Sequence, residues 1–152
     1  MKIWIDADAC PRDVKEVVFK ASARMSIPVV LVANKAMHAP PAFPLVTMTQ
    51  VKGGPDVADD HIVEHSSTGD LAITADIPLA ARLVEKRVHV IDPRGEVYDE
   101  DNVRERLSVR DFMAEARDIG GITTGGPAAY APKDKQRFAA SLDRALRSFT
   151  RL

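Results

Sequence analysis

The sequence has a single cysteine, Cys10, so no disulfide can join two parts of the chain. It is also poor in aromatic residues, at 5%, and no apolar run approaches the roughly 18 residues that cross a bilayer. The first six residues lack the apolar stretch of a secretion signal. These absences argue against a disulfide-stapled scaffold and against a membrane partner, and we expect a cytoplasmic location.

Excess charge of one sign is missing as well, since the net charge is only -1. Bulk electrostatics therefore does not indicate a nucleic-acid-binding protein. The charge is nevertheless uneven: residues 101–152 carry 10 Lys and Arg against 7 Asp and Glu, while residues 1–100 carry 11 against 15. We hypothesise that the C-terminal arginines contact a phosphate backbone, and the alternative is a solvated face of ion-paired helices. The candidates are Arg104, Arg110, Arg144 and Arg147.

Short aliphatic runs alternate with helical patterns along the chain. The expected strands are 2–6, 27–33, 45–51, 71–74 and 88–91, and the expected helices are 11–25, 56–67, 76–86, 102–107, 108–119 and 133–149. Residues 120–132 hold four glycines and two prolines and are expected to form a loop. The alternation predicts a three-layer α/β/α fold with a mostly parallel sheet of about five strands. We expect one domain over residues 1–152, with the helices from about residue 102 packed on it.

Acidic residues follow two of the expected strands. Asp6 and Asp8 come after the first strand, and Asp76 comes after the strand at 71–74. Right-handed crossovers bring the carboxyl ends of parallel strands to one edge, where ligands bind near the point at which strand order reverses. Turn and helix-cap roles are the alternative for each acid taken alone.

A third acidic group lies at the start of the expected helix 56–67. At about 100° per residue, Asp59 falls on the apolar side between Ile62 and Val63, and Asp60 falls toward the flank. A buried carboxylate needs a partner; capping of its own helix is the alternative. Clustered carboxylate oxygens favour a hard cation, so we predict a Mg²⁺ or Mn²⁺ site.

Several motifs resemble one bacterial family. The residues that carry the likeness span most of the chain, and the family is that of the YaiI/YqxD-like proteins. The segments that carry the likeness are Ile5-Asp6-Ala7-Asp8-Ala9-Cys10-Pro11, Gly54-Pro55-Asp56-Val57-Ala58-Asp59-Asp60, Ile73-Thr74-Ala75-Asp76-Ile77-Pro78-Leu79-Ala80 and the region of Gly125-Gly126-Pro127.

The resemblance implies a relation to PIN-like nucleases, including the NYN group. It implies a PIN-like fold and metal ligands at Asp6, at Asp59 or Asp60, and at Asp76 in the Thr-x-Asp strand end. PIN-like enzymes commonly carry a further acid in a helix between the first strand and these motifs. No residue here matches it, and Asp8 is the substitute that the sequence offers.

The leading hypothesis is a metal-dependent nuclease that hydrolyses phosphodiester bonds in RNA. Asp6, Asp59 and Asp76 would hold the ion, and Asp8 and Asp60 would be supporting catalytic acids. A non-catalytic module that binds nucleic acid or protein is the alternative, and it fits the missing acid and the low net charge.

Two other patterns give weaker alternatives. Asp6-Ala7-Asp8 after an apolar strand suggests a haloacid-dehalogenase-like phosphatase, with Asp6 as nucleophile and Asp8 as general acid. The segment from His61 to His65 has the H-x-x-E-H form of inverted zinc peptidases, but no third ligand is evident. A thiolate at Cys10, before a helix, is a further alternative to a packed thiol.

Overall fold

The computed structural model describes residues 1–54, 56–120 and 129–150. The strands are β1 (Ile3–Asp6), β2 (Val29–Ala33), β3 (Val46–Gln50), β4 (Leu71–Ile73), β5 (His89–Ile91) and β6 (Val97–Tyr98). The helices are η1 (Ala7–Ala9), α1 (Arg12–Met25), α2 (Val57–His65), α3 (Ile77–Glu85), α4 (Glu100–Gly120) and α5 (Pro132–Thr150). Most of the loop predicted at 120–132 lies outside the described residues.

The six strands form one sheet in the order β3-β2-β1-β4-β5-β6. All neighbours pair in parallel except β5 and β6, which are antiparallel. The predicted α/β class with a mostly parallel sheet is confirmed. The sequence analysis missed β6, because a two-residue strand after a tight turn leaves no periodic signal.

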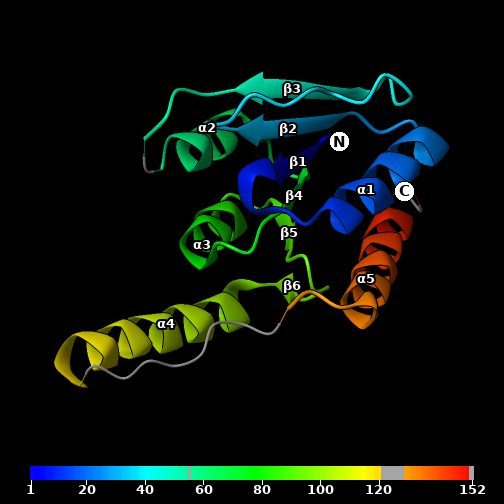
Figure 1. The fold of residues 1–152 in the computed structure, drawn as a ribbon. Coiled ribbons are helices and arrows are strands. Elements are labelled where there is room, and N and C mark those ends of the chain that lie inside the picture. The colour runs from blue at the N-terminus through cyan, green and yellow to red at the C-terminus, as the bar shows by residue number, and fades with distance from the viewer. Residues whose placement is uncertain (55, 121–128, 151–152) are drawn as a thin grey trace.

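Successive side chains of β1 point to opposite faces of the sheet, and this explains the three layers. Ile3 and Ile5 point to one face of the sheet, where they join the core formed with α1 and α5. Trp4 points to the other face and joins the core under α2 and α3. Figure 1 shows α1 and α5 on one side of the column of strands and α2 and α3 on the other. Both faces of the sheet are therefore covered, as parallel strands with near-continuous apolar sequences require.

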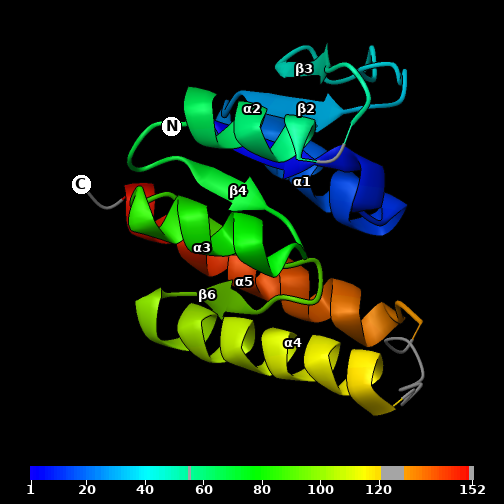
Figure 2. The same cartoon turned by 90° about the vertical axis from the view of Figure 1, so that its left-hand side faces the viewer.

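Helix α4 runs beside α3, as the view turned by 90° shows (Figure 2). Its first turns bury Val103, whereas Val109 and Phe112 further along are 54% and 68% exposed. The sequence analysis predicted two helices, 102–107 and 108–119, with a break at Ser108. That break was wrong, since Ser108 only weakens a helix and no glycine or proline interrupts residues 100–119.

The turn from Asp92 to Gly95 reverses the chain between β5 and β6, and Gly95 N donates to Asp92 O at 2.9 Å. Gly95 has a φ of 92° and lies directly against the main chain of α5. A Cβ atom there would be 2.6 Å from the carbonyl carbon of Arg137.

Within residues 1–54, 56–120 and 129–150, no helix combines the length and the apolar character that a membrane-spanning segment needs.

We expect Gly95→Ala to lower the free energy of unfolding more than Gly69→Ala, measured by urea denaturation. Gly69 has a nearly equal φ of 93°, but nothing lies within 4 Å of a Cβ placed there. Positive φ alone should destabilise either variant by about 1–2 kcal/mol. The clash with α5 should add about 1–3 kcal/mol at Gly95 only. Equal losses in the two variants would contradict the close approach of the turn to α5.

Candidate functional site

The strand order reverses between β1 and β4. From β1 the chain adds β2 and β3 on one side and then returns to place β4 on the other side. The connections after β1 and β4 therefore diverge, and we call the carboxyl edge between them, where open α/β sheets bind ligands, the crevice. Asp6 ends β1 and Thr74 follows β4. The Thr74 hydroxyl donates to Asp6 Oδ2 at 3.0 Å, which ties the two strand ends together.

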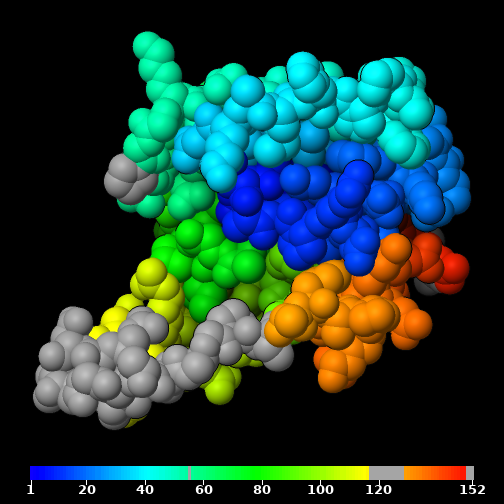
Figure 3. Space-filling view, in the orientation of Figure 1, coloured from blue at the N-terminus to red at the C-terminus, as the bar shows by residue number. Residues whose placement is uncertain are grey.

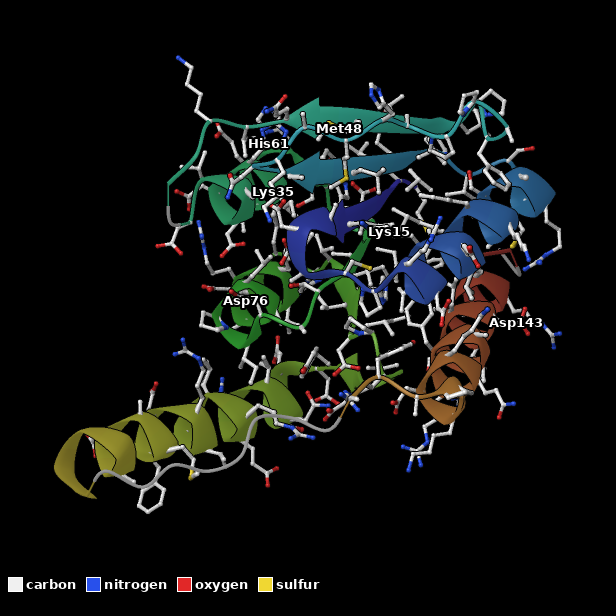
Figure 4. The ribbon with its side chains drawn as sticks, in the orientation of Figure 1. Lys15, Lys35, Met48, His61, Asp76 and Asp143 are labelled. Carbon is white, nitrogen blue, oxygen red and sulfur yellow. The ribbon has the colours of Figure 1, made fainter. Side chains whose placement is uncertain are left out.

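Asp76 begins helix α3 at the same edge (Figure 4). Its Oδ1 accepts a hydrogen bond from Leu79 N at 2.9 Å, so the helix-cap interpretation is correct for this oxygen. Its own N–H donates to the Thr74 hydroxyl at 3.0 Å. Thr74 thus links Asp6 to Asp76, and the cap engages only one of the two Asp76 carboxylate oxygens.

Asp59 reaches the same region from α2. Burial, followed by repulsion from Asp76, Asp6 and Asp56, raises the pKa of Asp59 to about 6, and only Arg82 acts in the opposite direction. Its partial burial agrees with the inward placement predicted from helix phase. Because repulsion between carboxylates falls with distance, Asp59, Asp6 and Asp76 share one electrostatic environment.

Asp6 shows the same environment from the strand side. Burial raises the pKa of its carboxyl group, the hydrogen bond from Thr74 lowers it, and Asp76 and Asp8 raise it further. Three separate elements, β1, α2 and α3, therefore bring like charges together at the crevice. This is an arrangement that a cation would stabilise.

Asp8 and Asp60 make different contacts from these three acids. Asp8 Oδ2 accepts from Asn34 N at 2.7 Å and Oδ1 from Lys35 N at 3.4 Å, which fixes η1 to the loop after β2. Asp60 Oδ1 forms an exposed ion pair with Arg82 Nη1 at 2.8 Å. Both residues support the walls of the crevice.

The donor set fits a hard divalent cation in its chemistry, since Asp6, Asp59 and Asp76 offer carboxylate oxygens. As arranged, however, no group of three or more His, Cys, Asp or Glu residues in the described part of the chain could hold a metal ion. A buried amide oxygen, Asn34 Oδ1, lies at the end of β2 without a hydrogen-bond partner. The carboxylates would have to draw closer to bind an ion, which requires rotation of side chains such as Asp59 on α2.

Comparison with known proteins identifies the family. Residues 4–148 match the model described as "Uncharacterized BCR, YaiI/YqxD family". The chain belongs to the YaiI/YqxD family. A UPF0178 protein of Trichlorobacter lovleyi is 58% identical over 146 residues, which are 96% of this chain and 94% of the relative. UPF0178 proteins of Geobacter metallireducens and Myxococcus xanthus are 59% and 54% identical over 146 residues, covering 96% of this chain and 93% and 94% of their own.

The predicted resemblance to the YaiI/YqxD family is thus confirmed. No solved structure matches the chain significantly. The names of these relatives state no activity, so the function has to be argued from the site itself.

The four predicted phosphate-binding arginines do not gather on one surface of this YaiI/YqxD protein. Arg104 lies between α3 and α4 near Glu85 and Glu100, and Arg110 is exposed further along α4. On α5, Arg144 is exposed near the β5–β6 turn, whereas Arg147 pairs with Asp143 at 3.1 Å and lines a groove toward α1. Their role in binding stays a prediction.

The alternative motifs gain little from the structure. Burial raises the pKa of Cys10 to about 12, so this thiol is not a thiolate at neutral pH. The rings of His61 and His65 stack with centroids 4.0 Å apart, and His65 Nδ1 lies 2.9 Å from the His61 carbonyl oxygen. Both oxygens of Asp8 are engaged by backbone N–H groups, which leaves it poorly placed as a general acid for a phosphatase.

Sequence reasoning overlooked three residues at this edge. Asn34 follows β2 and Asp92 follows β5, so each occupies the position that drew attention to Asp6 and Asp76. The signal for both was therefore available in the strand ends. Arg82 lowers the pKa of Asp59. No sequence pattern pointed to this residue, because it approaches Asp59 from the second turn of another helix, α3.

Asp59 should make stability depend on pH. Its pKa is about 6 in the folded protein against 3.8 ordinarily, so the folded state binds this proton more tightly. The free energy of unfolding should therefore fall as the pH rises through about 4 to 6, and the full loss applies above that window. Asp59→Asn removes the ionisation. We expect it to stabilise the protein at about pH 8 and not at about pH 4, measured by urea denaturation.

Asp60→Asn is the matched control, one residue along the same helix. It removes only an exposed ion pair with Arg82, so its effect should lie within about 1 kcal/mol and bring no gain at high pH. A stability change in Asp59→Asn that is the same at both pH values would contradict repulsion at the crevice.

Proposed function

We propose that this YaiI/YqxD protein is a Mg²⁺- or Mn²⁺-dependent nuclease that hydrolyses phosphodiester bonds in RNA. The observation that carries the proposal is the meeting of Asp6, Asp59 and Asp76, from β1, α2 and α3, at the point where the strand order reverses. Phosphodiesters are anions, so an acidic crevice can accept one only with a cation present. The acids themselves therefore support a metal-dependent reaction.

Asp6, Asp59 and Asp76 would hold the ion. Mg²⁺ or Mn²⁺, when bound, promotes ionisation of water and neutralises charge that develops on phosphoryl oxygens. Asp59 must lose its proton to act as a ligand, and with a pKa of about 6 it does so near neutral pH. The Thr74 hydroxyl orients Asp6 by donating to Oδ2, and the helix cap fixes the rotation of Asp76.

The supporting acids keep this geometry. Asp8 holds the loop at Asn34 and Lys35 beside the crevice through its two hydrogen bonds. Asp60 holds the Arg82 guanidinium, which lowers the pKa of Asp59. In this proposal Asp8 and Asp60 act through other residues, and Asp6, Asp59 and Asp76 would hold the ion.

We expect Mg²⁺ or Mn²⁺ to stabilise the protein against heat, measured as the melting temperature over a metal titration. Selective binding to the folded state at roughly 100 times the Kd adds about 2.7 kcal/mol to the free energy of unfolding. Asp6→Asn should abolish the metal-dependent rise. Asp101→Asn, which changes an exposed carboxylate in the first turn of α4, should keep it. A rise of equal size in both variants would place the ion elsewhere.

We expect cleavage of single-stranded RNA in Mn²⁺ to fall by about 100-fold or more in Asp6→Asn and in Asp76→Asn, because loss of a ligand removes several kcal/mol of charge stabilisation. Asparagine can still accept from Thr74 at position 6 and still cap α3 at position 76, so these variants remove charge and retain the fold. Cleavage should be followed on a gel with a labelled oligonucleotide. Equal activity in the wild type and both variants would remove the mechanism.

A non-catalytic nucleic-acid-binding module is the second candidate. It is favoured by the observation that no three potential ligands in the described residues are arranged to hold an ion. A module of this kind would bind RNA equally with and without a chelator and would cleave it in neither condition. The cleavage assay therefore separates the two candidates.

A further inference from the structure

A cavity of about 660 Å³ lies next to the acidic crevice. Its floor is formed by the turns after β1, β4 and β5, and its walls come from β6, α4 and α5. Ala75 and Ile77, which flank Asp76, both line it. In Figure 3 the surface of the residues after β1 (blue) borders that of the start of α5 (orange), with the green surface of the middle of the chain beside them. The volume is typical of a small-ligand site.

Arginines as well as acids line the cavity, in contrast to the crevice. The lining charges are Arg94, Arg106 and Arg137, with Asp92 and Glu96. Arg106 Nη2 binds both carboxylate oxygens of Glu96, at 2.9 and 2.8 Å, and Arg94 Nη1 pairs with Asp134 Oδ2 at 3.2 Å. Each of these two arginines therefore has an acid that offsets its charge.

Arg137 is the third arginine of the cavity. It is exposed, and within the described part of the chain its side chain has no hydrogen bond or ion pair. Its main chain lies against Gly95, whose missing Cβ permits an approach that would place that atom 2.7 Å from the Arg137 oxygen. The guanidinium is thus carried on a fixed backbone and remains available for an anion.

Two tyrosines give the cavity aromatic walls. Tyr98 of β6 is buried, and Tyr130, ahead of α5, is half-buried. The Tyr130 hydroxyl donates to Pro93 O at 2.8 Å, which anchors its ring at the cavity. Burial raises the pKa of each phenol to about 12, so both rings stay neutral. An aromatic side chain beside an arginine is the combination that takes an unstacked base and its phosphate.

We propose that this cavity receives one nucleotide of a single-stranded nucleic acid, adjacent to the phosphate held at the acidic crevice. Arg137 contacts the backbone phosphate of that nucleotide, and Tyr130 contacts its base. The inference rests on the proposed function, since the crevice fixes which phosphate is the neighbour. A duplex is excluded as the ligand, because a base must leave its stack to enter a cavity of this size.

The test is binding of a fluorescein-labelled oligouridylate of about 10 nucleotides, measured by fluorescence anisotropy. All proteins carry Asp6→Asn, and a chelator is present, so no cleavage or metal is required. We expect Arg137→Gln to weaken binding about fivefold or more and to reduce the slope of log K against log salt by about 0.7. Arg24→Gln, which changes an exposed arginine in the last turn of α1, is the control and should change binding by less than about twofold.

The base contact has its own pair of variants. Tyr130→Ala removes the ring and should weaken binding about tenfold. Tyr130→Phe keeps the ring and loses only the hydrogen bond to Pro93, so it should stay within about twofold of the parent. Circular dichroism and melting temperature establish that each variant is folded, and Arg137→Gln breaks no hydrogen bond seen in the structure.

Equal loss in Arg137→Gln and Arg24→Gln would overturn the cavity in favour of diffuse electrostatic attraction to the protein surface. Unchanged binding in Arg137→Gln and Tyr130→Ala would also overturn it, as would tighter binding of duplex than of single strands. The affinities for single-stranded DNA and for single-stranded RNA of the same sequence are measured as well, and tighter binding of either one supports the cavity. Failure of the nuclease proposal is seen separately, as absent cleavage by the wild type in Mn²⁺ while the cavity variants still lose binding.

Discussion

Parallel pairing of β1 with β2 on one side and β4 on the other is the constraint on which the site depends. It forces the chain to leave the sheet in opposite directions after the two strands, and it places Asp6 within hydrogen-bond reach of Thr74. No local preference of the chain could hold carboxylates from β1, α2 and α3 together, because they repel and lose hydration. Burial of strands on both faces supplies the stability that offsets this repulsion.

The sheet edge then carries an acidic region and, beside it, a cavity lined by arginine and tyrosine side chains. The crevice concentrates Asp6, Asp59 and Asp76, and the neighbouring cavity presents Arg137 and Arg106 with two tyrosines. A polyanion with aromatic bases is complementary to such a pair when a cation occupies the acidic part. The two proposals therefore describe neighbouring parts of one ligand, and each has an experiment that does not depend on the other.

Much of the fold could be predicted because both faces of the sheet are buried. Short aliphatic runs such as 29–33 between turn signals are typical of strands covered on both faces, and helices such as α1 and α3 show a clear apolar stripe. Prediction failed where the local signal was weak. β6 has only two residues. Ser108 suggested a helix boundary, but α4 continues through this residue and packs against α3. Asp56 begins α2 as expected, but with a left-handed backbone and no side-chain cap.

By itself the sequence determined the family, the α/β class and the acids of the strand ends, because these follow from local patterns and from motifs spread over most of the chain. It could place Asp59 inward from the phase of one helix. Only the tertiary structure decided which acids meet: Asp60 turns to Arg82, Asp8 binds a loop, and Asp76 caps α3 through one of its oxygens while its charge raises the pKa of Asp59. The cavity likewise arises only when β6, α4 and α5 close on the sheet edge, since contacts among residues so distant in sequence are set by packing and not by any local preference.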